Sequence, residues 1–310
     1  MGYAVVLGEA LVDLLETELE TGELIYRQAI GGAPLNVAVG VTRLGGEVRY
    51  VGSLGGDTLA DRIAAFLTET GVATTSVTRV PVPTTLAVTT FEGAEPTFQF
   101  YGEPPSYSLV TPDDVDEAAV AGAAVVYAGS IALMREPFQA AARAAWSVPG
   151  PVRVFDPNVR PKLLPDVAAV DELRDLVEEY FATADLVKLS SADVEVLWNG
   201  ATPETAASHI LKLGARAVVV TCGAKGAYIA TPDGTAMIPA PRVAAVDATG
   251  AGDSVMAALV SRLLVQGVPV DLAGWQGYVT FALQVAGLVC ERPGGAVAMP
   301  TVEELATRWS

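Results

Sequence analysis

One short segment combines small residues with a carboxylate in a spacing that could bind and transfer a phosphate. Residues 246–254 read VDATGAGDS and lead into a stretch with helical periodicity. Gly250 and Gly252 let a ligand approach the backbone, and the first N–H groups of a helix attract anions. Asp253 lies beside this cradle and could accept the proton of an attacking alcohol. The segment predicts phosphoryl transfer to a hydroxyl, with Asp253 as base and the N–H groups of Gly250, Ala251 and Gly252 around the phosphate.

A second set of residues, near the N-terminus, could bind a polyol. Gly31 and Gly32 precede a segment with helical periodicity, Asn36 falls in its first turn, and Asp13 follows an apolar strand-like segment. A carboxylate accepts hydrogen bonds and an amide both donates and accepts, so Asp13 and Asn36 could hold adjacent sugar hydroxyls. The alternative is that Asp13 only ends a strand and Asn36 only caps a helix.

Composition excludes several classes of protein. The chain has 310 residues, of which 51% are hydrophobic and 18% charged, and a formal net charge of −17. This balance excludes a disordered chain, and the negative charge argues against nucleic acid as a partner. The N-terminus has no basic stretch and no segment long enough to span a bilayer, so we expect a cytoplasmic protein. Cys222 and Cys290 are expected to be core thiols, and His209 a helix residue at or near the surface.

Short apolar segments alternate with amphipathic ones, which is typical of an α/β fold with a parallel sheet. We expect strands at 5–8, 48–52, 124–128, 152–155, 186–189 and 217–221, and helices at 34–44, 58–71, 137–146, 170–182, 204–213, 250–266 and 273–289. Residues 13–28 and 84–101 instead alternate with period two, the latter with a turn at Gly93. They predict a small sheet that projects from the main one.

Several motifs, in the expected order, resemble the signatures of the ribokinase-like (PfkB) family of carbohydrate kinases. They are GEALVD at 8–13, GGAPLNVA at 31–38, DPNVR at 156–160, TCGAKG at 221–226 and the segment at 246–254. The resemblance spans nearly the whole chain. It implies a central, mostly parallel sheet flanked by helices, in one kinase domain over 1–310. It also implies a β-sheet lid over the sugar, formed by segments at about 13–30 and 82–104.

The resemblance, closest to fructokinases, implies an ATP-dependent sugar kinase that uses Mg²⁺ and acts most readily on fructose. It leaves open whether a monovalent cation such as K⁺ also binds. The substrate-binding residues it implies are Asp13, Gly31, Gly32, Asn36, Phe100, Tyr101 and Arg160. For the nucleotide they are Lys188, Thr221, Gly223, Gly226, Thr249, Gly250 and Gly252. For the metal they are Asp156, Asn158 and Asp193, acting through waters.

Two positions depart from the family pattern. Ser190-x-x-Asp193 replaces the usual Asn-x-x-Glu near the metal, and Gly102 stands where fructokinase-like lids often carry an Arg.

The nearest alternative function is that of a 2-keto-3-deoxygluconate kinase. Its acidic substrate would need a basic partner in the lid, and residues 84–101 contain no basic residue. A nucleoside kinase is another alternative. From a different class, a sugar- or nucleotide-binding regulator without catalysis stays open, although an intact Asp253 argues against it.

The projecting sheet also predicts self-association. It would leave free strand edges and an apolar face that includes Phe91, Phe98, Phe100 and Tyr101. Members of the resembled family often pair their lids, so a homodimer through the lid is expected.

Overall fold

The computed structural model describes residues 2–92 and 95–309, and within them the strands form two sheets. The larger sheet has nine strands in the order β13-β12-β11-β10-β9-β8-β1-β4-β5. Neighbouring strands are parallel from β11 to β5, whereas β12 and β13 add an antiparallel edge. The strands are β1 (Tyr3–Leu7), β4 (Glu47–Leu54), β5 (Ala73–Arg79), β8 (Val125–Gly129), β9 (Val152–Asp156), β10 (Leu186–Ser190), β11 (Ala217–Thr221), β12 (Ala227–Thr231) and β13 (Gly234–Ile238).

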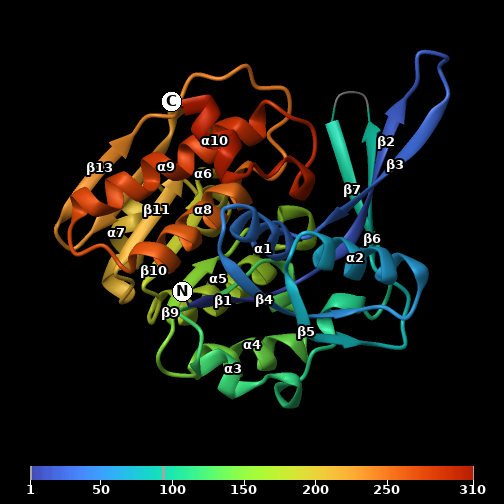
Figure 1. Cartoon of the computed structure of the whole chain (residues 1–310), viewed down its shortest axis with the longest axis horizontal. Coiled ribbons are helices and arrows are strands. Elements are labelled where there is room, and N and C mark those ends of the chain that lie inside the picture. The colour runs from blue at the N-terminus through green and yellow to red at the C-terminus, as the bar shows by residue number, and fades with distance from the viewer. Residues whose placement is uncertain (1, 93–94, 310) are drawn as a thin grey trace.

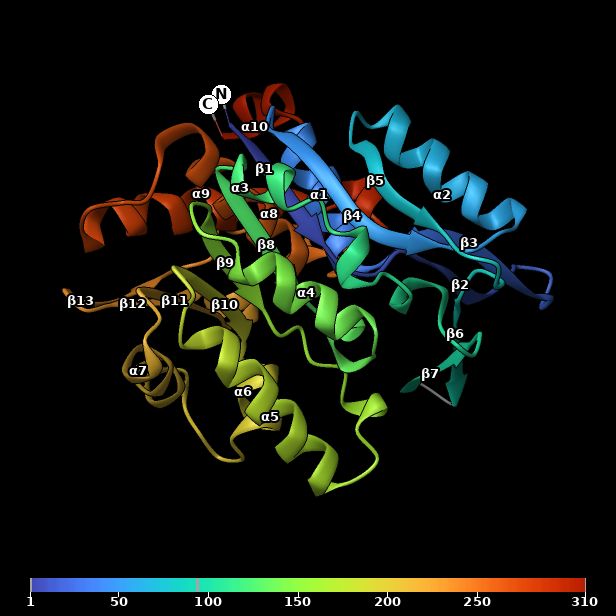
Figure 2. The same ribbon diagram turned by 90° about the horizontal axis from the view of Figure 1, so that it is seen from below.

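Helices cover both faces of the larger sheet (Figure 2). One face is covered by α1 (Ala33–Arg43), α2 (Thr58–Glu69), α8 (Ala251–Gln266), α9 (Leu272–Cys290) and α10 (Val302–Trp309), whose buried side chains share one core. The other is covered by α3 (Glu117–Ala121), α4 (Phe138–Ser147), α5 (Val167–Phe181), α6 (Ser191–Leu197) and α7 (Pro203–Leu213), which share a second core.

Strand β11 shows why apolar segments form this sheet. Its residues Val218, Val219 and Val220 are fully buried. Successive side chains of a strand point to opposite faces, so Val219 joins the first core while Val218 and Val220 join the second. A continuous apolar segment is therefore needed wherever helices cover both faces.

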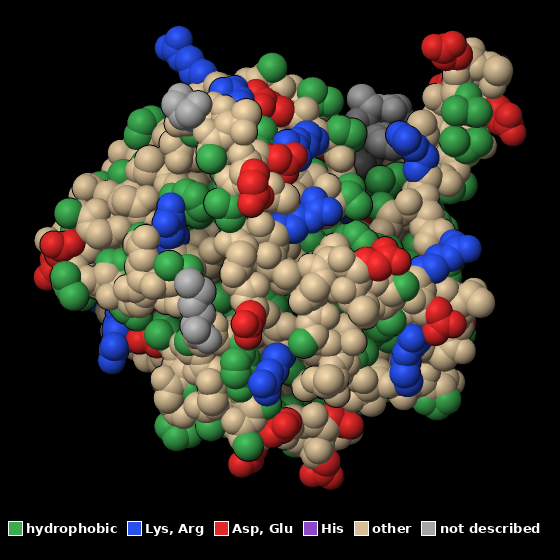
Figure 3. Space-filling model, viewed as in Figure 1, with side chains coloured by type: hydrophobic (Ala, Val, Ile, Leu, Met, Phe, Trp, Pro, Cys, Tyr) green, Lys and Arg blue, Asp and Glu red, His purple; other side chains and the backbone are tan. Residues whose placement is uncertain are grey.

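The smaller sheet has the strand order β3-β2-β6-β7 and stands away from the body (Figure 1). It consists of two antiparallel hairpins, β2 (Leu11–Glu18) with β3 (Leu24–Gly31) and β6 (Leu86–Glu92) with β7 (Glu95–Tyr101), joined by a parallel β2–β6 pair. We call this sheet the lid. Figure 3 shows the β2–β3 end of the lid projecting clear of the molecule, with acidic and apolar side chains on it.

The predicted fold class is confirmed: a mostly parallel sheet flanked by helices, with a separate small sheet. The division into one domain with two lid segments stays a prediction, and the predicted turn at Gly93 lies outside the described residues. The structure also contains elements that were not predicted, namely β5, α3, β12, β13 and α10. Within the described residues, no helix is both long enough and apolar enough to cross a bilayer.

The expectation for the cysteines was wrong. Cys222 and Cys290 are free thiols of intermediate exposure, because each lies just beyond a buried stretch, near the end of its element. His209 lies half-buried on α7, as expected, and its Nε2 is 2.9 Å from Oε1 of Glu178.

Candidate active site

A cavity of about 1010 Å³ lies between the lid, the start of α1 and the start of α8. It opens at the edge of the large sheet where the parallel strands end, which is where α/β folds bind ligands. Predicted site residues line it together: Asp13, Gly31, Gly32, Asn36, Phe100, Arg160, Thr249, Gly250 and Asp253. The chain therefore brings residues from all three thirds of its length to one place.

Asp253 lies in the first turn of α8 and is only 8% exposed. The side-chain amides of two asparagines donate to its carboxylate. Nδ2 of Asn36 is 2.7 Å from Oδ2, and Nδ2 of Asn158 is 3.3 Å from Oδ1. Such donors stabilise and orient an ionised carboxylate. Asp253 is thus held in a fixed orientation at the cavity wall.

The turn before α8 presents free N–H groups beside Asp253. Gly250 caps the helix with a left-handed φ of 77°, a conformation that favours glycine. Within the described part of the chain, the N–H groups of Gly250 and Gly252 donate to no acceptor. The N–H of Ala251 donates instead to the Ala248 carbonyl at 3.1 Å, so the predicted role of Ala251 in the cradle is reduced to shaping the turn.

A buried ion pair lies against this turn. Nζ of Lys188, on β10, is 2.8 Å from Oδ2 of Asp156 at the end of β9, and both side chains are almost fully buried. A Cβ added to Gly252 would lie 3.2 Å from Nζ of Lys188. Burial raises the pKa of Asp156 to about 6 although the charge of Lys188 lowers it. Burial lowers the pKa of Lys188, but the carboxylates of Asp156, Asp193 and Asp253 together outweigh this and the net pKa is raised, so the ammonium stays charged beside the cradle.

The predicted metal residues already have protein partners. Oδ1 of Asp156 accepts from the Asn158 backbone N–H at 3.1 Å, and the amide oxygen of Asn158 accepts from the Arg160 guanidinium. Oδ2 of Asp193 accepts from the N–H and hydroxyl of Ser190 at 2.6 and 2.7 Å, and Oδ1 accepts from the Val159 N–H at 2.8 Å. These residues do not fit a direct ligand set for magnesium.

Asp193 caps α6 and fixes the loop after β9, and its predicted water-mediated role at the metal stays a prediction. Its shorter side chain suits this capping box, in which cap and third residue bond each other's backbone. Among residues 2–92 and 95–309, no cluster of three or more His, Cys, Asp or Glu side chains is arranged to hold a metal ion.

Asp13 and Gly31, both predicted to bind the sugar, line the cavity next to each other. A Cβ on Gly31 would lie 2.0 Å from Oδ2 of Asp13, so only glycine leaves room for the carboxylate. A Cβ on Gly32, whose φ is 115°, would lie 2.4 Å from the Glu9 carbonyl oxygen. Burial raises the pKa of Asp13 to about 6, and the charge of Arg160 lowers it in part. Both glycines are thus required for the close approach of β2 and the start of α1.

Tyr101 does not line the cavity, although Phe100 does. Consecutive strand residues point to opposite faces, and Tyr101 is 49% exposed. Its predicted role in substrate binding is therefore corrected. In contrast, Arg27 on β3 does line the cavity and was not predicted. Its position follows from the pairing of β2 with β3, in which Arg27 lies opposite Leu15.

Glu9 is a second residue that the sequence analysis missed. It follows β1, lines the cavity and is 2% exposed. Its Oε1 accepts from the Ser130 hydroxyl at 2.6 Å and from the Ala33 N–H at 3.3 Å, which ties the start of α1 to the turn after β8. Burial raises the pKa of Glu9 to about 7 despite the Ser130 hydrogen bond. The signals in the sequence are its position shortly after a buried strand and its place in the motif at 8–13.

The predicted nucleotide residues on β11 lie outside the cavity. Thr221 ends β11, parallel to Ser190 at the end of β10. Gly223 has open space around it, which leaves its backbone accessible to a ligand. Gly226 has a different requirement, because a Cβ there would lie 1.9 Å from the Ile238 carbonyl oxygen. Gly226 thus permits the β11–β12 turn, and Gly223 is the better candidate for nucleotide contact.

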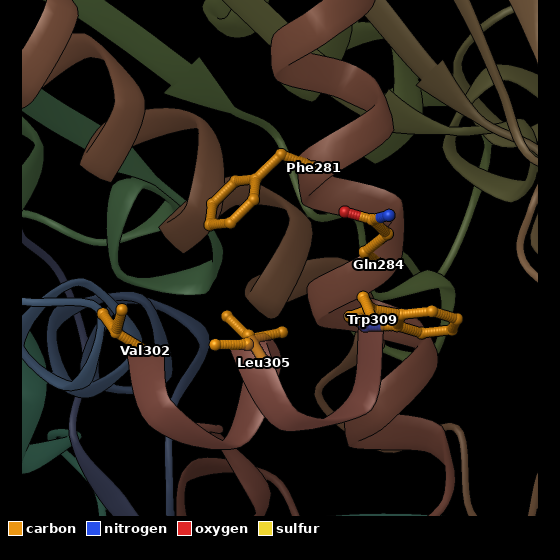
Figure 4. Close-up of a pocket in the computed structure, with 6 residues that line it drawn as sticks. Phe281, Gln284, Val302, Leu305 and Trp309 are labelled. Carbon is orange, nitrogen blue, oxygen red and sulfur yellow. The ribbon is translucent and has the colours of Figure 1, made fainter.

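A smaller hollow of about 250 Å³ lies between α9 and α10 (Figure 4). It is mostly apolar, with Phe281, Leu305 and Trp309 around it. None of the predicted site residues lies there, so we assign it no role in the chemistry.

The fold and cavity together define a ribokinase-like kinase. The chain matches the pfkB family of carbohydrate kinases over residues 1–302 and belongs to this family. It is therefore a carbohydrate kinase. Fructokinase-2 of Solanum habrochaites is 31% identical over 316 residues, covering 99% of this chain and 95% of that one.

Solved structures agree with this assignment. Xylella fastidiosa fructokinase with bound ATP superposes with a TM-score of 0.89 at 28% identity, covering 98% of this chain and 97% of that one. Aminoimidazole riboside kinase of Salmonella enterica, complexed with aminoimidazole riboside and an ATP analogue, has a TM-score of 0.86 at 26% identity. The alignment covers 99% of both chains.

Proposed function

We propose that this kinase transfers the γ-phosphoryl group of ATP to a primary hydroxyl of fructose, with Asp253 as the general base. One arrangement carries the proposal: Asp253 and Gly250 line one cavity together with Asp13, and among the described residues the N–H groups of Gly250 and of Gly252, beside Asp253 in the chain, donate to no acceptor. A base beside an anion cradle suits phosphoryl transfer to an alcohol. The fructokinase relatives support fructose as the acceptor.

In the proposed reaction, the acceptor hydroxyl lies against Asp253 and gives its proton to the carboxylate as its oxygen bonds to the γ-phosphorus. The bond from the γ-phosphorus to the β,γ-bridging oxygen breaks, and ADP leaves. The N–H groups of Gly250 and Gly252 stabilise the charge on the transferring group. Asn36 and Asn158 hold the carboxylate in position. Asp13 and Asn36 would bind other sugar hydroxyls.

The nucleotide is proposed to lie along the ends of β10 and β11, with its phosphates toward the start of α8. Lys188 supplies a positive charge beneath the turn, and Thr221, Gly223 and Thr249 border the path. Magnesium would come with the ATP phosphates and screen their charge. Asp156 and Asn158 could reach it only through waters, because their oxygens already accept hydrogen bonds.

A second acceptor class is favoured by one observation. Arg27 lines the cavity from the lid and could pair with a carboxylate, as 2-keto-3-deoxygluconate would require. The Salmonella relative likewise makes a riboside worth testing. Release of ADP from magnesium–ATP should be measured with fructose, 2-keto-3-deoxygluconate and a set of ribosides.

We expect the highest kcat/KM with fructose. Turnover of another acceptor, with fructose at background, would refute fructose and leave the kinase assignment standing. No turnover with any acceptor, together with measurable ATP binding, would favour the regulator without catalysis.

We also propose that the lid forms a homodimer. Its order β3-β2-β6-β7 leaves β3 and β7 as open edges, and Leu24 and Tyr26 on β3 are 62% and 49% exposed. Open edges with exposed apolar side chains favour pairing with a second chain. Light scattering at micromolar concentration should give twice the mass of the chain, and a monomer mass would refute the dimer.

A further inference from the structure

The Thr89 hydroxyl is a buried polar group without a partner, and it lies at the cavity. Thr89 is on β6, is 4% exposed and lines the cavity. Within the described residues its Oγ1 has no hydrogen-bond partner. Buried hydroxyls are nearly always hydrogen-bonded, and leaving one unpaired is costly. If only the shape of the side chain mattered here, valine would fill the same space without burying an unpaired hydroxyl. The unpaired hydroxyl therefore points to a ligand.

The strand pairing shows where on the lid this hydroxyl lies. Asp13 on β2 is paired with Ala87 on β6, and Leu15, two residues further along β2, is paired with Thr89. Residues two apart on a strand share a face, so Asp13 and Thr89 both face the cavity. Strand spacing and rise per residue place their Cα atoms about 8 Å apart. One sugar with its hydroxyls can span this separation.

The neighbours of Thr89 on this face make its hydroxyl distinctive. Leu15 and Ala87, which border it on the sheet, are apolar and also line the cavity. Asn36 carries the other unpaired buried atom at the cavity, its Oδ1. Asn36 lies at the Asp253 end, whereas Thr89 lies on the lid. Among the described residues, the cavity thus has one buried unpaired atom near Asp253 and one on the lid side.

We infer that Thr89 is a specificity residue, which binds a hydroxyl of the acceptor on the side remote from the hydroxyl that is phosphorylated. This inference rests on the proposed function of a sugar kinase. A threonine hydroxyl both donates and accepts, as a sugar hydroxyl does, so either partner can donate. A deoxygenated acceptor would leave Thr89 unpaired and bind more weakly. The residue thus selects for hydroxylation at one position of the sugar.

The first experiment needs no sugar. Thr89→Val keeps the shape and removes the hydroxyl. Thr75→Val, on the exposed edge strand β5, is the matched control. Because the unpaired hydroxyl is removed, we expect urea unfolding of Thr89→Val at a higher midpoint than the parent protein and the control. A lower midpoint would mean that the hydroxyl already has a partner, and would overturn the inference.

The second experiment is kinetic, with fructose as acceptor. Loss of a binding contact raises KM more than it lowers kcat. We expect the KM of Thr89→Val for fructose to rise about tenfold, Thr89→Ser to recover most of this loss, and Thr75→Val to match the parent. Unchanged KM in Thr89→Val would overturn the inference.

A third arm identifies the contact, using singly deoxygenated fructoses. With the parent protein, one analogue should have a kcat/KM about tenfold below that of fructose. With Thr89→Val, the same analogue and fructose should have equal kcat/KM values. Equal losses in both proteins for every analogue would contradict a direct contact. If the parent does not phosphorylate fructose, that result refutes the proposed acceptor alone. The same comparison is then made with the acceptor that it does phosphorylate, and the unfolding experiment stands unchanged.

Discussion

Nδ2 of Asn36 lies 2.7 Å from Oδ2 of Asp253, although the two residues are 217 positions apart in the chain. Asn36 is in the first turn of α1, which begins after the glycines of the proposed sugar site, and Asp253 is in the first turn of α8, which begins at the proposed phosphate cradle. This hydrogen bond connects the two sides of the site at the proposed base. It fixes the orientation of the Asp253 carboxylate.

Replacing this donor with a second carboxylate should shift the pH dependence of the reaction. In Asn36→Asp, two neighbouring carboxylates cannot both ionise easily, so one keeps its proton to higher pH. Activity depends on an ionised base, so the acid limb of the kcat/KM profile should move upward by about one pH unit or more. Asn36→Leu removes the same hydrogen bond but adds no charge, so it should move the acid limb less than Asn36→Asp does. An acid limb in Asn36→Asp at the pH of the parent protein would argue against Asp253 as the base.

Gly31 should be intolerant of even one methyl group. In Gly31→Ala, the new Cβ would lie 2.0 Å from Oδ2 of Asp13 and would displace the carboxylate. We expect the KM for the sugar to rise about tenfold or more. Gly277→Ala, at a helix position on α9 with open space around it, should instead leave KM unchanged. Steady-state kinetics on both variants makes the comparison, and equal KM values would contradict it.

Glu9 should make the protein less stable as the pH rises. Burial raises its pKa from 4.5 to about 7 in the folded protein, so the folded state binds this proton more tightly than the unfolded state. Stability from this group is fully present below pH 4.5 and is lost as the pH rises to about 7, a loss of about 3 kcal/mol.

Urea unfolding at several pH values tests this dependence. The unfolding free energy of the parent protein should fall between pH 5 and 7 relative to Glu9→Gln, which cannot ionise. Glu69→Gln, at the exposed end of α2, should follow the parent. Parallel curves for the parent and Glu9→Gln would show that Glu9 does not titrate in this range.

Much of the fold could be predicted because its signals are local. The apolar segment at 217–221 became β11 with the same bounds, and the segment at 246–254 placed Asp253 in the first turn of α8. Phe100 and Tyr101 could have been separated by strand alternation alone, since adjacent residues of a strand face opposite sides. The sequence analysis assigned both to the sugar, and only Phe100 lines the cavity.

Other features depend on contacts between distant segments. The partner of Glu9, Ser130, is 121 positions away, and the burial that raises the pKa of Glu9 comes from the whole fold. Arg27 and Thr89 reach the cavity because of how β2 pairs with β3 and β6, and hairpin register cannot be read from alternation alone. The resemblance to the family predicted a metal role for Asp193, whereas its hydrogen bonds with Ser190 and Val159 are seen in the structure.

The central claim is that Asp253 accepts the proton of the acceptor hydroxyl. Asp253→Asn keeps the shape of the side chain and removes its ability to accept that proton. The most direct measurement is kcat of this variant at saturating sugar and magnesium–ATP, with the Kd for ATP measured by calorimetry on the same preparation. We predict that kcat falls by about 100- to 10,000-fold while the Kd stays close to that of the parent protein. A kcat near that of the parent would contradict the assignment of Asp253 as the base.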